Sequence, residues 1–171
     1  MRTSVESGRR VGSYTHNPWF AGSALRRSDQ PDFGTGGLDS SPSFRAEADV
    51  DQPSETPLFA DGVLGASNII FASSTFVWRL DFLGPLGTDL PAADLVLGGN
   101  WWDGGMGVFT IPRHGSRPST IPTNHPPTAI LPGAINVAFY DGHVETAKLE
   151  RLWSFYWHKD YVPPVKRPGL K

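Results

Sequence analysis

The feature that most restricts the fold of this chain is a pair of β-rich runs joined by Asp141-Gly142. The first run spans residues 135–140 and the second spans residues 143–146. An Asp-Gly pair between two such runs is a strong short-range signal for a β-hairpin, because a two-residue type I′ turn needs positive φ at both central positions. The sequence therefore predicts an antiparallel hairpin closed by a two-residue turn.

Side chains alternate between the two faces of a strand, so the hairpin has a predicted core face and a predicted outer face. The core face is apolar and carries Ile135, Val137, Phe139 and Val144. The outer face is more polar and carries Asn136, Tyr140, His143 and Glu145. We expect the first set to meet the hydrophobic core.

Further strands are predicted upstream of the hairpin. An apolar run in residues 56–63 ends at the turn signal Asp61-Gly62, which is typical of the end of a strand. Residues 67–80 are expected to add a strand or a packed loop, and residues 95–97 at most a short strand. Alternating side chains predict another strand over residues 105–112.

A Pro-rich segment, residues 113–133, holds five prolines and two histidines, and long loops of this kind are either functional or insertions. After the hairpin, an apolar stripe at helical spacing predicts a short helix that cannot continue past Pro163-Pro164. The stripe consists of Leu149, Leu152, Trp153 and Tyr156. We expect Trp153 to be buried, with Trp157 near the edge and the other side of the helix more open at Arg151, Ser154 and Phe155.

A length of 171 residues suits a single domain with one core. The 19 glycines and 16 prolines predict long irregular loops. The expected fold class is α+β, with an antiparallel sheet and a short C-terminal helix. The predicted parts are a loop-rich lead-in (1–56), the sheet (57–148), the helix (149–160) and a tail (161–171) whose basic residues Lys166, Arg167 and Lys171 form a solvated end.

Charge and composition exclude several classes of function. The formal net charge is -2, so the chain has no electrostatic footprint for nucleic acid or for an anionic membrane surface. The absence of cysteine excludes disulfides, thiolate metal sites and thiol nucleophiles. The first thirty residues contain no continuous apolar stretch of the kind found in a signal peptide or a membrane span.

Three segments resemble motifs of one bacterial family. Residues 132–145, which read PGAINVAFYDGHVE, resemble the "G-x-x-N-x-x-F-x-D-G-H-V" core of prepilin-like proteins of the H-x9-D-G group. Residues 12–19 (GSYTHNPW) are similar to the family's "S-Y-x-x-N-x-W", and residues 56–62 (TPLFADG) are similar to "T-P-x-F-x-D-G". The aromatic residues after the hairpin also look like the C-terminal tail of one branch of the family.

The chain departs from the family pattern in two places. Leu131 stands ten positions before Asp141, where the family has its named histidine. Arg113-His114-Gly115 looks like the family's "R-H-G" displaced by a Pro-rich insertion, so His114 is the better counterpart. Family members also begin with a basic leader and a long apolar helix, and we expect the native gene to encode such a segment of about 20 apolar residues before Met1.

The resemblance implies a pilin-like or pseudopilin-like head that serves as a structural component of a type II secretion-like pseudopilus or a type IV pilus-like system. Its implied partners are other pilin or pseudopilin subunits and the secretion or assembly machinery. The implied location is the cell envelope or its extracellular face, with membrane contact only through the N-terminal helix. No cofactor is expected. Some pseudopilins carry calcium near the C-terminus, but no ligand motif here identifies a calcium site.

The family motif supplies the candidate site residues, which are Asn136, Phe139, Asp141, Gly142, His143, His114, Asp61 and Gly62. For Asp141 and His143, a structural turn is favoured over a catalytic or metal-binding pair, because a tight turn needs Asp-Gly for backbone reasons alone. Three histidines are candidate imidazole ligands, but their spacing matches no compact zinc motif. They are His114, His125 and His143.

A carbohydrate-binding or other ligand-binding β-rich module is the alternative function. Trp101-Trp102 and the cluster from Trp153 to Trp157 could stack on sugar rings, although core packing is more common for such residues. The chain has no nucleophile elbow, paired-carboxylate motif, phosphate-binding glycine loop or HExxH motif. The sequence therefore predicts a protein that is not an enzyme.

Overall fold

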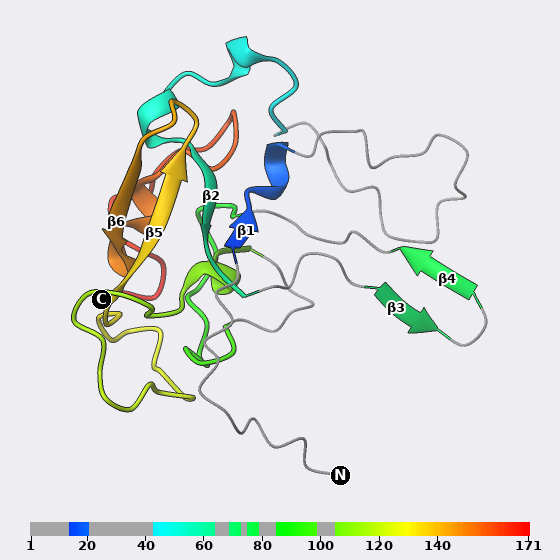
Figure 1. Cartoon of the computed structure of the whole chain (residues 1–171). Coiled ribbons are helices and arrows are strands. Elements are labelled where there is room, and N and C mark those ends of the chain that lie inside the picture. The colour runs from blue at the N-terminus through cyan, green and yellow to red at the C-terminus, as the bar shows by residue number, and fades with distance from the viewer. Residues whose placement is uncertain (1–13, 21–42, 64–68, 73–74, 79–84, 99–104) are drawn as a thin grey trace.

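The computed structural model describes residues 14–20, 43–63, 69–72, 75–78, 85–98 and 105–171. Its main element is a four-stranded sheet in the order β1-β2-β5-β6, in which every neighbouring pair is antiparallel (Figure 1). The strands are β1 (Tyr14–His16), β2 (Pro57–Asp61), β5 (Ala134–Phe139) and β6 (Val144–Lys148). Strands β3 (Ile69–Ala72) and β4 (Thr75–Trp78) pair with each other in a separate two-stranded sheet. The predicted antiparallel sheet is confirmed.

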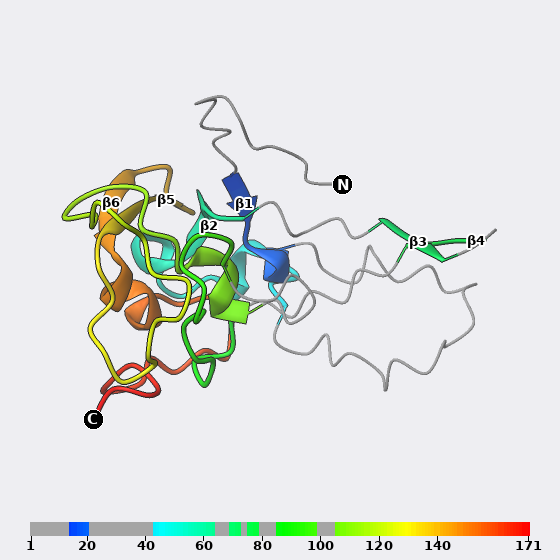
Figure 2. The ribbon, with the colours of Figure 1, turned by 90° about the horizontal axis from the view of Figure 1, so that it is seen from below.

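The helices of the described residues are all 3-10 helices. They are η1 (Pro18–Phe20), η3 (Glu47–Asp49), η4 (Pro53–Glu55), η5 (Gly105–Phe109) and η6 (Leu149–Ser154). Figures 1 and 2 together place η6 on one side of β5 and β6, where it covers the core face of the sheet. The predicted C-terminal helix is therefore present but short, since it ends at Ser154 rather than at residue 160.

The predicted hairpin is confirmed as β5–β6, but its predicted two-residue turn is wrong. The Gly142 amide donates to the Phe139 carbonyl at 3.0 Å, and the Phe139 amide donates to the His143 carbonyl at 2.9 Å. The loop therefore consists of Tyr140, Asp141 and Gly142, with Gly142 in the left-handed region at φ 91°. Glycine is favoured at this position of a three-residue hairpin loop. Contacts outside the hairpin hold this arrangement, because the Tyr140 amide donates to the Thr56 carbonyl at 3.0 Å.

The longer loop moves the register of β6 by one residue, and such a shift sends side chains to the opposite face. Val144 pairs with Ala138 and is exposed on the outer face, so its predicted place in the core is wrong. Glu145 pairs with Val137 instead. The prediction holds for the three β5 residues assigned to the core face, which are all buried: Ile135, Val137 and Phe139.

The strand predicted over residues 105–112 is also wrong, because residues 105–109 form η5 and are buried throughout. Gly105 has φ 63°, a conformation that side chains rarely tolerate and that a regular strand does not use. The Met106 amide that follows donates to the Asp89 carboxylate at 3.2 Å. Gly105 thus allows a tight turn inside the core where alternation alone suggested a strand.

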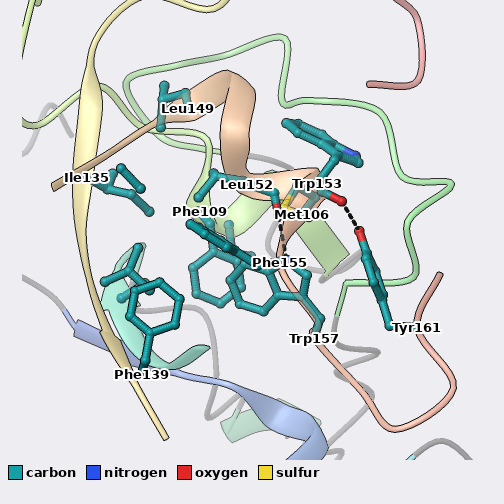
Figure 3. Packing of buried hydrophobic residues seen from close by; sticks show 14 of the residues in the cluster. Met106, Phe109, Ile135, Phe139, Leu149, Leu152, Trp153, Phe155, Trp157 and Tyr161 are labelled. Atoms are coloured by element: carbon teal, nitrogen blue, oxygen red, sulfur yellow. Dashed lines mark hydrogen bonds between the residues drawn. The ribbon is translucent and has the colours of Figure 1, made fainter. Parts of the chain in front are cut away.

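The core lies between the sheet and the two helices η5 and η6 (Figure 3). Its largest fully buried side chains include Trp153, Trp157, Phe109, Phe139 and Phe155. The burial of Trp153 confirms the prediction for that residue, whereas the open position of Phe155 and the edge position of Trp157 are wrong. After η6 ends, the chain continues without helical geometry, so helical spacing no longer determines which side chains face inward.

The lead-in and the tail of the domain both contain residues that take part in the folded structure, contrary to the prediction. Within the lead-in, residues 14–16 form β1, a strand of the main sheet. In the tail, Arg167 is buried rather than solvated, and its guanidinium binds the Glu150 carboxylate at 2.8 Å. Residues 95–97 form a turn, in which the Asp94 carboxylate accepts hydrogen bonds from the amides of Val96 and Leu97.

Candidate functional site

Three candidate residues that lie far apart in the sequence meet at the outer face of the sheet. The Asp61 carboxylate at the end of β2 accepts a hydrogen bond from the backbone amide of Asn136 on β5 at 2.8 Å. The same oxygen, Oδ2, lies 3.0 Å from Nε2 of His114. The Asn136 side-chain amide lies 3.0 Å from that imidazole nitrogen, and its Oδ1 accepts from the Thr146 hydroxyl at 2.8 Å. We call this group the Asp61 cluster.

Burial differs sharply within the Asp61 cluster. The Asp61 side chain is 6% exposed, whereas the His114 side chain is 43% exposed. A buried carboxylate needs donors, and the backbone amide of Asn136 supplies one. Nε2 of His114 can either donate to Asp61 or accept from the Asn136 side-chain amide, and the tautomer of His114 determines which of these two contacts is a hydrogen bond. The Asp61 cluster therefore joins the end of β2 to the backbone of β5.

Among the described residues, the polar contacts of the His114 ring are Asp61 and Asn136. Within the described part of the chain, no hydroxyl group is hydrogen-bonded to the His114 ring, so the Asp61–His114 pair activates no nucleophile there. Within the same ranges, no group of three or more His, Cys, Asp or Glu residues is placed to hold a metal ion.

His114 reaches the Asp61 cluster through backbone pairing. Its amide and carbonyl both bond to Ala134, the first residue of β5, at 2.8 Å. The Pro-rich segment thus leaves the sheet after His114 and returns to the same point at Gly133. Sequence spacing alone suggested that the histidine was displaced, but in the structure it lies beside Asn136.

Gly62, the other half of the Asp61-Gly62 signal, is required for steric reasons. A Cβ at this position would lie 2.4 Å from the Thr15 hydroxyl of β1 and 2.8 Å from the Thr15 Cβ. The Thr15 hydroxyl also donates to the Val63 carbonyl at 2.9 Å. Gly62 therefore allows β1 to approach the end of β2.

The remaining motif residues form a second group at the tip of the hairpin. The Asp141 carboxylate lies 2.6 Å from Nδ1 of His143 and accepts the His143 amide at 3.1 Å. These hydrogen bonds, from the imidazole first and the amide second, hold the pKa of the Asp141 carboxyl below its usual value. The His143 ring stacks on Phe139 with centroids 4.4 Å apart. The contacts are those of a capped turn.

The three candidate histidine ligands do not come together. His114 lies at the beginning of β5 and His143 just beyond its end, and a strand of this length spans about 17 Å. His125 is buried in the Pro-rich segment, where its Nε2 lies 3.4 Å from the Ala129 carbonyl. A metal site shared by these residues does not form.

The described tryptophans of the aromatic cluster are buried. Trp153 donates from Nε1 to the Asp89 carbonyl at 2.9 Å. Trp157 donates from Nε1 to the Leu152 carbonyl at 2.7 Å (Figure 3). Neither ring is open to a sugar. Trp101 and Trp102 lie outside the described residues.

Two buried polar residues with structural contacts, Asn17 and Arg167, were not among the predicted site residues. The buried side chain of Asn17 donates to the carbonyls of Pro57 and Trp157 at 2.9 and 2.8 Å, so it joins β2 to the chain after η6. Arg167 also donates to the carbonyls of Pro127 and Ala129 and thereby binds the tail to the Pro-rich segment. Asn17 belongs to a quoted motif, but no local pattern marks Arg167.

No family model, curated protein or solved structure shows a significant match to this chain. Among the described residues, none of the helices has the length and apolar character needed to cross a bilayer.

Proposed function

We propose that this chain is the head domain of a prepilin-like protein of the H-x9-D-G group and acts as a non-catalytic subunit of a pseudopilus-like or pilus-like assembly. Its partners in this proposal are other pilin or pseudopilin subunits and the assembly machinery. The assembly would lie in the cell envelope or on its outer face, with membrane contact through an N-terminal helix.

The observation that carries the proposal is the meeting of separated motif residues in the Asp61 cluster. Asp61 comes from the segment similar to "T-P-x-F-x-D-G", Asn136 from the hairpin core, and His114 from the displaced "R-H-G". Without residues 115–131, His114 would stand ten positions before Asp141, as the family pattern requires. The pairing of His114 with Ala134 is what such an insertion predicts, because its two ends must then lie side by side.

The role of these residues supports a structural rather than a catalytic function. Asp61 holds the β5 backbone, Gly62 admits β1, and Gly142 closes the hairpin. Asn17, from the motif near the N-terminus, links β2 to the segment after η6. Asn17, Asp61 and Gly62 therefore stabilise contacts between elements that are distant in the sequence, whereas Gly142 acts within the hairpin.

The alternative of a carbohydrate-binding module has less support. A stacking platform requires exposed aromatic rings, and both Trp153 and Trp157 are buried. No described contact favours this function over the proposed one.

The test is the location and the neighbours of the full-length protein in the organism that encodes it. We expect an epitope-tagged chain in the envelope and sheared-surface fractions, and we expect in-cell cross-linking to join it to pilin-like subunits identified by mass spectrometry. Confinement of the tagged chain to the cytosol, or the absence of pilin-like subunits among its cross-linked neighbours, would overturn the proposal.

A pair of aspartate variants tests the structural role of the motif. Asp61→Ala should destabilise the purified domain by about 1 to 3 kcal/mol, because it leaves the Asn136 amide without its acceptor. Asp51→Ala, at an exposed aspartate outside the motifs, should change stability by less than about 0.5 kcal/mol. Equal stability of the two variants would contradict a structural role for Asp61.

A further inference from the structure

Three aromatic rings from distant parts of the sequence pack together beside η1. The imidazole of His158 makes a T-shaped contact with the indole of Trp19 in η1, with centroids 5.3 Å apart, and another with the ring of Tyr161, with centroids 5.2 Å apart. All three residues are buried. We call them the aromatic clamp, because they join η1 to the segment that follows η6.

Hydrogen bonds fix the two outer rings of the aromatic clamp. Trp19 donates from Nε1 to the Pro85 carbonyl at 3.2 Å. The Tyr161 hydroxyl donates to the Trp153 carbonyl at 3.0 Å (Figure 3). The middle ring differs, since Nδ1 of His158 is buried and no group among the described residues is hydrogen-bonded to it. The imidazole therefore contributes to the clamp through packing.

The surroundings of His158 suit the neutral imidazole and oppose the imidazolium. A protonated ring carries a hydrogen on both nitrogens, so Nδ1 would become a buried charged donor without an acceptor in the described part of the chain. Burial lowers the pKa of His158, and the carboxylates of Asp160 and Asp89 oppose this effect without outweighing it. The neighbouring Lys159 is exposed, and the Tyr161 hydroxyl stays neutral because burial raises its pKa.

We infer that the aromatic clamp is an acid-sensitive contact, in which protonation of His158 opens the packing between η1 and the segment that follows η6. The closed form disfavours the proton and the open form accepts it, so a falling pH shifts the equilibrium toward the open form. Opening exposes the rings of Trp19 and Tyr161, which the neutral form buries. Acid would thus uncover an apolar surface on this side of the domain.

The size of the effect has an upper limit. An open-form histidine has its ordinary pKa of 6.5. If the closed form bound no proton at all, the ratio of open to closed form would rise about 30-fold between pH 8 and pH 5. Any proton binding in the closed form makes the increase smaller.

Hydrogen exchange of the purified 171-residue chain at pH 8 and pH 5 tests the inference, after correction for the intrinsic pH dependence of amide exchange. We expect residues 17–20 and 157–161 to lose protection by at least about threefold at pH 5, because local opening exposes their amides. The β5–β6 hairpin is the internal reference for global unfolding, and its amides should keep their protection.

Replacement of the imidazole identifies the group that binds the proton. His158→Phe keeps an aromatic ring and cannot be protonated, so it should abolish the local effect of acid. His125→Phe is the matched control, since both histidines are 8% exposed and His125 lies outside the clamp, and it should retain the effect. If His158→Phe fails to fold, His158→Gln takes its place, because glutamine is also uncharged at both pH values.

Four outcomes would overturn the inference. They are unchanged protection at residues 17–20 and 157–161, an equal loss of protection in the hairpin, a local loss that persists in the non-titrating His158 variant, and a local loss that His125→Phe also removes. The aromatic clamp lies within one chain, so the inference goes beyond the proposed assembly role, and its failure would leave that role standing.

Discussion

Truncation of Trp153 to alanine is the sharpest test of how this domain is held together. The side chain is 1% exposed, so Trp153→Ala removes a fully buried ring. Deleting a buried aromatic side chain costs about 3 to 5 kcal/mol. The change also leaves the Asp89 carbonyl without the indole N–H that donates to it, which adds about 1 kcal/mol or more. The stacking of the Arg167 guanidinium on the ring, with its carbon 5.5 Å from the centroid, is lost as well.

The expected total is about 4 to 6 kcal/mol, against a stability of about 5 to 15 kcal/mol for an ordinary domain. Urea denaturation followed by circular dichroism measures the difference. Trp153→Phe is the control, because it keeps most of the ring and loses chiefly the hydrogen bond, so we expect a smaller cost of about 1 to 3 kcal/mol. A Trp153→Ala variant within about 1 kcal/mol of the wild type would refute the packing argument, and its loss of binding in a glycan screen would favour a carbohydrate platform.

Three further variants test separate parts of the structure. Gly142→Val should destabilise the domain by about 1 to 3 kcal/mol through backbone strain alone, since no atom lies within 4 Å of the added Cβ, and an unchanged melting temperature would contradict the turn geometry. Gly62→Ala should be destabilising for the opposite reason, a clash with Thr15, and Thr15→Gly should restore part of the loss in thermal melts. Burial lowers the pKa of His158 from its ordinary value of 6.5, so its neutral form stabilises the fold above that pH and this contribution is lost as the pH falls below it. His158→Phe should therefore flatten the melting temperature between pH 7 and pH 5, and an unaltered pH dependence would show that other groups cause it.

The sequence alone was sufficient for the parts of the fold that local chemistry determines. Residues 134–148 form a hairpin because two β-rich runs flank Asp-Gly, and β2 ends at Asp61-Gly62 for a similar reason. The apolar alternation of β5 correctly assigned Ile135 and Phe139 to the core. These features depend on residues close together in the chain, so a pattern of a few positions contains them.

The candidate site was predictable as a set of residues but not as an arrangement. The motifs named Asp61, His114 and Asn136, yet their meeting depends on the pairing of His114 with Ala134 across the Pro-rich segment. The interpretation of the Pro-rich segment as an insertion implies that its two ends lie together, but only the structure shows that the backbone groups of His114 and Ala134 pair. Arg167 was missed because its partners, a distant carboxylate and two loop carbonyls, follow no local sequence pattern.

Tertiary structure alone decided the register of β6 and the burial after η6. The hairpin loop takes one extra residue, Tyr140 of that loop is bonded to Thr56, and the longer loop moves Val144 out of the core. Phe155 and Trp157 are buried because the chain leaves helical geometry after Ser154 and packs against the sheet and η5. Propensity and periodicity describe a segment by itself, whereas these outcomes depend on the surfaces that other segments offer to it.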